Sequence, residues 1–334
     1  MLPAEEPRMP QHRPPSAEAA PPEGLRLVAA DGVPLGGFLW RAAPLAGAEA
    51  RPVVVISPAT SVRCRYYARF AAWLAAQGID ALTFDYRGIG ESRPARLRGF
   101  RAGWADWGEL DLEAALGAAL ARFPGRDLAL VGHSIGGLAL GLAPSAARAR
   151  RLLTVGAQYA YWRDYAPRAR PGMLLKWHLA MPLLTALFGY MPARRLGWME
   201  DTPAGVARDW SGMGPRLEAQ LRDGPALAAR LGTLRAPLLA VSLADDPHGT
   251  PAAVERLLAY FTASPRHRLH LDPAALGLGP VGHFAFFHSR FAATLWPLAR
   301  DWLVAGRLPE GATPWPAPAA RPMRRSMTGE MARL

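Results

Sequence analysis

The pentapeptide Gly132–Gly136 reads GHSIG and holds a serine in a setting that can make it a nucleophile. An apolar run that reads DLALV precedes it, and a run of small and apolar residues typical of a helix follows it. In a G-x-S-x-G turn the serine sits on a sharp strand-to-helix bend, so its neighbours two residues away must be nearly without side chains. The bend exposes the Ser134 hydroxyl and places the N–H of Ile135 at a helix N-terminus, where it can stabilise an oxyanion.

A serine hydroxyl is a poor nucleophile until a base removes its proton, and the base needs an acid that orients it. Candidates for both groups follow Ser134 in the chain. Asp245 and Asp246 come directly after the apolar run PLLAVS, and His283 lies in a glycine-rich loop after the run RHRLHL. We therefore predict Ser134 as the nucleophile and His283 as the general base, with an aspartate as the third member of a triad.

The sequence offers two adjacent aspartates for the third member of the triad. Adjacent side chains on an extended chain point to opposite sides, so only one of Asp245 and Asp246 can face the histidine. We favour Asp246, which precedes a proline in the turn DDPHGTP, and expect Asp245 to support that turn. Asp164 is a third and less favoured candidate. His133, beside the nucleophile, is expected to pack within the bend.

An oxyanion hole needs a second N–H donor, which normally comes from the loop after an earlier strand. The run PVVVIS ends in such a loop, which reads Ser-Pro-Ala-Thr-Ser over residues 57–61. Pro58 has no N–H, so the second donor is Ala59 or Thr60. An ordinary turn between a strand and a helix is the alternative interpretation of this loop.

These candidates must be positioned by a regular framework, and strands and helices alternate along most of the chain. A turn signal, Asp31-Gly32, separates two opening strands. Eight strands are predicted at 25–29, 35–40, 52–57, 79–84, 127–131, 151–155, 237–242 and 266–271, with helices at 66–77, 107–123, 251–261 and 289–304 and after Ser134. This alternation predicts an α/β fold with a mostly parallel eight-stranded sheet and helices on both faces.

The alternation of strands and helices stops after the sixth predicted strand, because residues 157–232 carry no strand signal. We predict a cap inserted into the core. The predicted segments are a Pro- and Ala-rich disordered leader (1–23), a core (24–156 and 233–306), the cap (157–232) and a flexible Pro- and Arg-rich tail (307–334).

Two stretches of the predicted cap, 158–162 and 173–191, are heavily apolar. The second could be a lipid-facing amphipathic helix or an acyl-chain pocket, or it could pack its Leu and Met residues on the edge of the sheet. We favour packing for most of that face and a pocket for the remainder.

The formal net charge of +12 does not indicate nucleic-acid binding. Lys176 is the only lysine and asparagine is absent, so the excess of arginine reflects a compositional bias, and the arginines are scattered along the chain. Cys64 is the only cysteine, which excludes an intrachain disulfide. The N-terminus does not resemble a signal peptide, and no apolar run is long enough for an integral membrane segment. We expect a cytoplasmic protein.

The chain resembles the α/β-hydrolases, nearest to the serine-aminopeptidase-like and monoacylglycerol-lipase-like group of bacterial hydrolases. The resemblance covers about residues 25–303 and rests on the loop reading SPATSV, on DYRGIGES at 85–92, and on GHSIGG, DDPHGT and GHFAFF. It implies nucleophile, acid and base roles for Ser134, Asp246 and His283, and a structural role for the 85–92 loop. The chain departs from the family where a His-Gly pair is usual and Pro58-Ala59 stands instead.

We therefore predict a serine hydrolase that cleaves a carboxylic ester or thioester through an acyl-enzyme, with a small-molecule acyl substrate that has an apolar portion. No cofactor and no metal ion is implied. The same triad could serve acyl transfer or an aminopeptidase. A hydrolase fold kept as a non-catalytic binding module is the alternative from another class. The substrate, its acyl length and the oligomeric state do not follow from the sequence.

Overall fold

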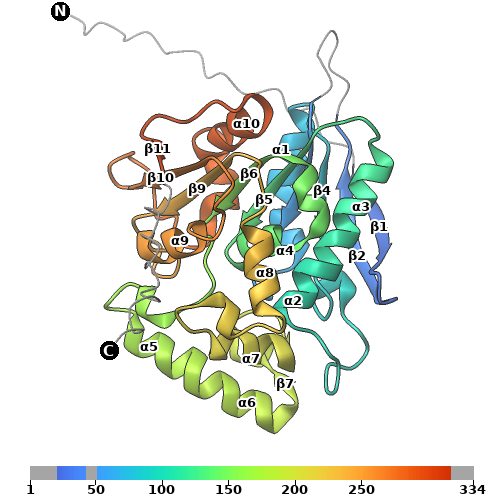
Figure 1. The fold of residues 1–334 in the computed structure, drawn as a ribbon, viewed down its shortest axis with the longest axis vertical. Coiled ribbons are helices and arrows are strands. Elements are labelled where there is room, and N and C mark those ends of the chain that lie inside the picture. The colour runs from blue at the N-terminus through green and yellow to red at the C-terminus, as the bar shows by residue number, and fades with distance from the viewer. Residues whose placement is uncertain (1–20, 43–50, 317–334) are drawn as a thin grey trace, which may run out of the picture.

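The structure is a computed structural model that describes residues 21–42 and 51–316. The predicted disordered leader lies almost entirely outside these residues, and so does the part of the predicted tail from 317 onward. The described chain is built on one large sheet with helices packed on both of its faces (Figure 1).

The sheet has nine strands in the order β1-β2-β4-β3-β5-β6-β9-β10-β11. Strands β4 to β10 in this order run parallel to one another, whereas β1, β2 and β11 pair antiparallel with their neighbours at the two edges. Their bounds are β1 (Glu23–Val28), β2 (Pro34–Trp40), β3 (Val53–Ser57), β4 (Ala81–Phe84), β5 (Leu128–His133), β6 (Ala149–Val155), β9 (Leu238–Leu243), β10 (Arg266–Leu271) and β11 (Thr313–Pro314).

The mostly parallel sheet with helices on both faces is as predicted, but the strand count of eight is too low by one. The ninth strand, β11, belongs to the segment predicted as a flexible tail, and it pairs with His267 and Arg268 of β10. A strand of two residues that contains a proline leaves no alternating pattern in the sequence, and its pairing partner is distant in the chain.

The buried central strands divide their side chains between two cores. Along β3, Val53 and Val55 belong to one apolar cluster, and Val54 and Ile56 belong to the other. This is the expected result of two-residue periodicity in a strand that is covered on both faces. Because both faces are packed, the carboxyl ends of the strands are held in place, and with them the starts of the loops that leave this edge of the sheet.

Helices complete both cores. The second cluster is closed by α1 (Ala68–Ala76) and α10 (Leu295–Ala305), and the first by helices that include α3 (Glu113–Arg122), α4 (Ile135–Leu142) and α9 (Pro251–Leu258). The helix predicted at 107–123 is longer at its start, because α2 (Trp104–Asp106) and a π-helical stretch (Trp107–Leu112) precede α3 without a break. Within the described ranges, no helix is long and apolar enough to cross a membrane.

The long insertion between β6 and β9 is mainly helical. It contains α5 (Arg170–Met173), a π-helical stretch (Leu174–Ala180), α6 (Met181–Phe188), α7 (Ala204–Gly212) and α8 (Gly224–Leu231). Two strands of two residues each, β7 (Tyr190–Met191) and β8 (Thr202–Pro203), form a small separate sheet that the sequence did not signal. Helices α5, α6 and α7 gather at one end of the molecule, below the large sheet in Figure 1.

Hydrogen bonds tie the insertion to loops at the carboxyl edge of the sheet. The Glu200 N–H donates to the Ser61 carbonyl in the loop after β3, and the Ala166 N–H donates to the Pro247 carbonyl after β9. Because the carboxyl ends of parallel strands meet at the same edge, the insertion covers the edge at which β5 delivers Ser134.

Candidate active site

Ser134 lies at the bend between β5 and α4 in a backbone conformation that a serine rarely adopts. Its φ is 55° and its ψ is −123°. Its N–H donates to the Val155 carbonyl of the neighbouring strand, and its own carbonyl accepts the Gly137 N–H at 3.0 Å. A non-glycine residue at positive φ carries strain that persists only where its surroundings enforce it. Here the strand, the helix and the adjacent strand enforce it together.

Both glycines of the pentapeptide are required by close backbone approach. A Cβ at Gly132 would lie 2.6 Å from the Gly137 Cα, and a Cβ at Gly136 would lie 2.2 Å from the Ser57 carbonyl oxygen. Each of these distances is shorter than any real Cβ contact. The two glycines of the G-x-S-x-G pattern are therefore required because α4 passes directly over the ends of β3 and β5.

Asp246 and His283 are joined by a hydrogen bond of 2.7 Å between Oδ2 and Nδ1. The other carboxylate oxygen, Oδ1, accepts the N–H groups of His248 and Gly249, each at 2.8 Å. Burial would raise the pKa of Asp246, but the charge and hydrogen bond of His283 and the two N–H donors hold it below its ordinary value. The ionised carboxylate thus fixes Nδ1 of His283 as the protonated ring nitrogen.

The other two candidate aspartates have different partners. Asp245 accepts the Val281 N–H at 2.8 Å through Oδ2, and it thereby holds the loop that carries His283. Asp164 is buried and forms a bidentate ion pair with Arg256. Of the three, only Asp246 contacts the His283 ring, which is the contact that the favoured assignment requires.

Ser134 and His283 have a common neighbouring segment around Gly156. Gly156 follows the carbonyl that receives the Ser134 N–H, and a Cβ on Gly156 would meet Asp246 Oδ2 at 2.9 Å and His283 Nδ1 at 3.2 Å. No hydrogen bond joins the Ser134 hydroxyl to the His283 ring in the described chain, and such bonds often tighten only in a substrate complex. The three groups nevertheless converge on one edge of the sheet.

His133 links the bend to the histidine loop. Its Nε2 lies 2.8 Å from the His283 carbonyl oxygen, and its Nδ1 lies 2.8 Å from the Tyr67 hydroxyl. A carbonyl oxygen can only accept, so Nε2 carries the proton and Tyr67 donates to Nδ1. Burial, assisted by His283, lowers the pKa of His133 to about 3, so this ring stays neutral. The packing role expected for His133 is accompanied by a defined pair of hydrogen bonds.

The same chain of hydrogen bonds reaches the predicted oxyanion loop. The Ala59 N–H donates to the Tyr67 hydroxyl at 2.9 Å, so it already has an acceptor. No hydrogen bond joins the Thr60 N–H to another residue of the described chain. Ile135 is the first residue of α4, and the first N–H groups of a helix have no acceptor within it. Ile135 and Thr60 are thus the N–H donors left available among the predicted three.

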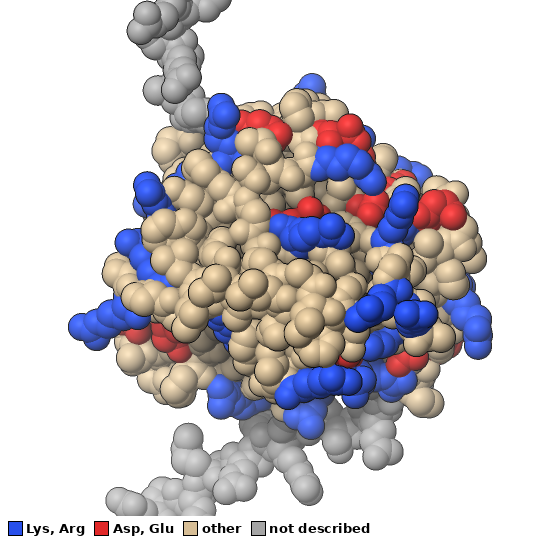
Figure 2. Space-filling view, turned by 90° about the horizontal axis from the view of Figure 1, so that it is seen from below, with Lys and Arg blue, Asp and Glu red and all other residues tan. Residues whose placement is uncertain are grey.

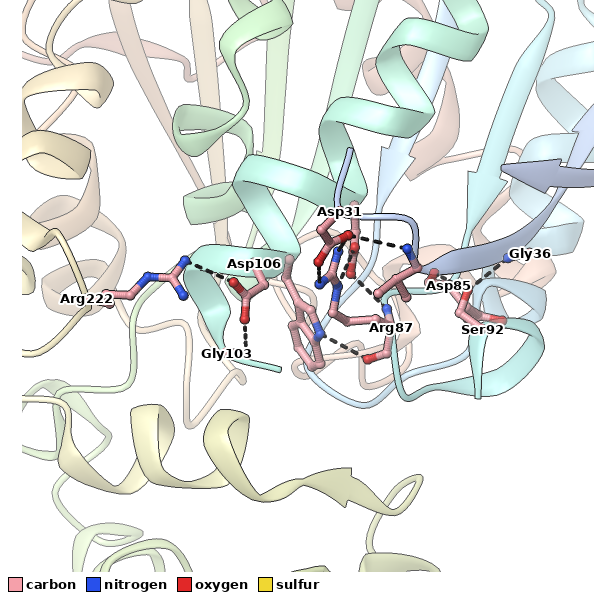
Figure 3. A network of polar contacts seen from close by, with 11 residues as sticks. Asp31, Gly36, Asp85, Arg87, Ser92, Gly103, Asp106 and Arg222 are labelled. Carbon is pink, nitrogen blue, oxygen red and sulfur yellow. Dashed lines mark hydrogen bonds and ion pairs between the residues drawn. The ribbon is translucent and has the colours of Figure 1, made fainter. Parts of the chain in front are cut away.

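The 85–92 loop is held by a polar network of side chains (Figure 3). Arg87 donates to both Asp31 and the buried Asp111. Ser92 accepts the Gly36 N–H and donates to the Asp85 carbonyl. These contacts bind the loop to the first strands of the sheet and to the helical stretch after α2, as the predicted structural role requires.

The Asp85 side chain fixes the other side of this loop. It accepts N–H groups from Cys64 and Glu91, at 2.6 and 2.8 Å. Burial raises the pKa of Asp85 to about 6, although these donors counteract it. The same aspartate accepts a hydrogen bond from the Cys64 thiol at 3.3 Å, and burial raises the pKa of that thiol. Cys64 is therefore an inert structural thiol.

An aromatic ring of the insertion reaches His283 indirectly, through His248 in the loop after β9. The His248 ring lies 5.0 Å from the His283 ring, and Tyr165 of the insertion meets His248 edge to face. Burial and the neighbouring His283 lower the pKa of His248 to about 3. Ser134 is only 6% exposed and His283 only 9% exposed, so the site lies beneath a cover.

Several of these residues were not identified from the sequence. The roles of Tyr67 and Gly156 arise from contacts with other segments of the chain. His248 and Gly249 lie within the DDPHGT stretch, but their N–H donors to Asp246 depend on the shape of that turn. Tyr67 carries a weak signal in hindsight, since it lies on a helix directly after the predicted oxyanion loop.

Comparisons with known proteins agree with this geometry. The family described as "Serine aminopeptidase, S33" matches residues 48–204. No curated protein matches the chain. Among solved structures, a soluble variant of monoglyceride lipase from Saccharomyces cerevisiae is similar, with a TM-score of 0.62 and 17% identity over 87% of this chain and 98% of that chain.

Two further solved structures share the fold. An esterase from Pyrococcus furiosus has a TM-score of 0.54 and 14% identity over 89% of this chain and 96% of its own. A monoacylglycerol lipase from Paleococcus ferrophilus has a TM-score of 0.52 and 14% identity over 82% of this chain and 99% of its own. The family match over residues 48–204, the shared fold and the strained serine between strand and helix lead to one assignment: the chain has the α/β-hydrolase fold.

Proposed function

We propose that the protein is a serine hydrolase that cleaves a carboxylic ester or thioester through an acyl-enzyme on Ser134. The observation that carries the proposal is the convergence of the strained Ser134 bend with the hydrogen-bonded pair His283–Asp246. A serine held at positive φ is costly, and the loops around it bring a base with a fixed tautomer to the same edge.

In the proposed reaction the Ser134 hydroxyl attacks the carbonyl carbon while His283 Nε2 takes its proton. Asp246 keeps the proton on Nδ1 and stabilises the imidazolium that forms. The N–H groups of Ile135 and Thr60 hold the developing oxyanion. His283 then protonates the leaving alcohol or thiol, and a water molecule, activated in the same way, releases the acid from Ser134.

The substrate is proposed to carry an apolar acyl portion. The insertion turns Met173, Trp177 and Met181 inward as buried side chains within the same apolar cluster as Ile135. Structural neighbours include proteins named as a monoglyceride lipase and an esterase. Apolar side chains supplied by the insertion would suit the apolar part of an ester, with hydrogen bonds reserved for the reacting carbonyl.

An aminopeptidase on the same triad is the second candidate, because the matched family carries that description. A free amine would need an unpaired carboxylate in the insertion. Glu200 and Asp201, the acidic pair there, are 2.9 Å from Arg63 and Arg93 respectively. These pairings favour the ester over the peptide. Acyl transfer to an alcohol or amine would use the same acyl-enzyme and would be recognised by its product.

A fluorophosphonate probe tests whether Ser134 is activated. We expect the full-length protein to be labelled, and Ser134→Ala to lose both labelling and the hydrolysis of p-nitrophenyl esters by a factor of about 10⁴ or more. Ser289→Ala removes an exposed serine instead and should label like the wild type.

Comparison of p-nitrophenyl esters with aminoacyl p-nitroanilides separates the esterase from the aminopeptidase. Faster turnover of the anilides would favour the peptidase. A folded wild type that neither labels nor hydrolyses either substrate would overturn the catalytic proposal in favour of a binding module.

A further inference from the structure

The helix that runs through α5, the π-helical stretch and α6 has an apolar outer face. Four leucines point to solvent along it, and they are the residues at 175, 179, 183 and 187. Their exposed fractions run from 53% to 70%. Residues four apart form a single ridge along a helix. We call these four side chains the leucine ridge.

The opposite side of the same helix packs on the core, so packing of the helix does not account for the leucine ridge. Met173, Trp177, Met181 and Thr185 are buried, and they are also spaced by four residues. The two sets are offset by two residues, so they lie on opposite sides of the helix. The inner set is sufficient to attach the helix to the core, whereas leucines more than half exposed cost solubility and usually mark an interaction surface.

The chain segment that carries the ridge has charge of one sign. Residues 165–199 contain no aspartate or glutamate, and their basic residues are Arg168, Arg170, Lys176, Arg194 and Arg195. Figure 2 looks onto this end of the molecule and shows a broad uncharged expanse, with more basic than acidic side chains at its margins. A hydrophobic ridge bordered by cations is complementary to a surface of acyl chains and anionic headgroups.

Cations are also fixed at the carboxyl end of the ridge. Arg98 donates to the carbonyls of Leu187 and Phe188, and the Arg195 guanidinium lies 5.7 Å from the centre of the Phe188 ring. These arginines therefore keep a defined position beside the last ridge leucine. A second copy of the chain would bring an equally basic surface against this one, so the charge disfavours self-association.

We propose that the leucine ridge and its basic border dock the protein onto an anionic phospholipid membrane, with the helix lying in the plane of the surface. The helix would insert its outer leucines among the acyl chains while its inner face stays on the core. Docking would hold the covered edge of the sheet against a source of apolar esters. That consequence rests on the proposed function, but binding itself does not.

Co-sedimentation with vesicles tests the proposal without any hydrolysis. Full-length Ser134→Ala is mixed with phosphatidylcholine vesicles that contain or lack phosphatidylglycerol. We expect binding to the anionic vesicles, weaker binding to the neutral ones, and a loss of anionic binding as salt is raised. Leu179→Gln, Leu183→Gln and Leu187→Gln together should lower the partition coefficient by about tenfold or more.

Two matched variants define the controls. Leu276→Gln with Leu308→Gln removes exposed leucines elsewhere, which are 52% and 40% exposed, and should bind like the parent. Arg194→Gln with Arg195→Gln should reduce the preference for anionic vesicles. Thermal unfolding and circular dichroism establish that each variant is folded.

Three results would overturn docking by the ridge. The first is no binding to either vesicle, and the second is equal loss of binding in the ridge and control variants. The third is a parent that is dimeric without vesicles and becomes monomeric with the ridge substitutions, which would assign the ridge to contact between copies. Each result is independent of probe labelling at Ser134, so failure of the docking proposal and failure of the hydrolase proposal are distinguishable.

Discussion

His133 shows how a residue beside the proposed nucleophile can organise the site without taking part in the proposed chemistry. Its two ring nitrogens connect Tyr67, which holds the oxyanion loop, with the backbone of His283. The ring must be neutral to do both, because a second proton on Nδ1 would oppose the donor hydroxyl of Tyr67. Since the ring is fully buried, the folded protein resists its protonation.

This resistance predicts a pH dependence of stability that belongs to His133. In the unfolded chain the ring binds a proton below about pH 6.5. In the folded protein its pKa is about 3, so folding loses stability as the pH falls from 6.5 toward 3. The free energy of unfolding of the wild type should fall relative to that of His133→Gln by about 1.4 kcal/mol for each pH unit in this range.

Urea unfolding of both proteins from pH 7 down to pH 4 measures the difference. His248 also has a pKa of about 3, but it is present in both proteins and its contribution cancels. Parallel stability curves would mean that His133 titrates normally in the folded protein, and the assigned hydrogen-bond directions would then be wrong.

At the scale of elements, the crossing of α4 over the end of β3 depends on glycine. A Cβ on Gly136 would lie 2.2 Å from the Ser57 carbonyl oxygen and 2.7 Å from that of Pro58. Backbone atoms on both sides of the contact cannot yield without moving the strand or the helix. Gly136→Ala should therefore lower the free energy of unfolding by about 2–3 kcal/mol, as overpacking does in other cores.

Gly117→Ala is the matched control within a helix. Gly117 lies in α3, and an added Cβ there meets nothing within 4 Å. The alanine should raise stability by about 0.5–1 kcal/mol, because glycine is a poor residue in a helix interior. Chemical denaturation of the two variants should give opposite signs. Equal small effects would show that the α4 crossing is looser than the structure has it.

The sequence was most informative where a local pattern has one structural solution. Strand β10 has the predicted bounds, 266–271, and the glycines around Ser134 are explained by backbone contacts at the predicted bend. The choice between Asp245 and Asp246 depended on the turn that follows them. Asp246 has the expected contact with His283, whereas the Asp245 side chain holds the histidine loop instead of its own turn. The site roles themselves await the probe experiment.

Features formed by distant segments were beyond the sequence. Strand β11 has two residues, and its partner β10 lies more than forty residues earlier in the chain. The bonds of Tyr67 to Ala59 and His133 likewise join three separate segments. The insertion was predicted as a unit, but neither its two-residue strands nor the outward direction of its leucines follows from composition alone.

On the scale of the whole molecule, the proposed reaction requires the insertion to move so that a substrate can reach Ser134. The serine and His283 are nearly inaccessible, and buried apolar side chains together with ion pairs hold the insertion on the core. One of them is the ion pair of Arg93 with Asp201, at 2.9 Å. Asp201 also accepts the Arg194 N–H through its other carboxylate oxygen.

Asp201→Asn removes the charge of this fastening and keeps an oxygen for the Arg194 N–H. If opening precedes labelling, a loss of about 1 kcal/mol from a partly buried ion pair should speed fluorophosphonate labelling about fivefold. Glu255→Ala is the control, because it breaks the ion pair with Arg268 on the core, away from the insertion, and should leave the labelling rate unchanged. The rate constant is measured under pseudo-first-order conditions for all three proteins. An unchanged rate in Asp201→Asn would show that this contact does not limit access, whereas acceleration in both variants would point to general loosening of the fold.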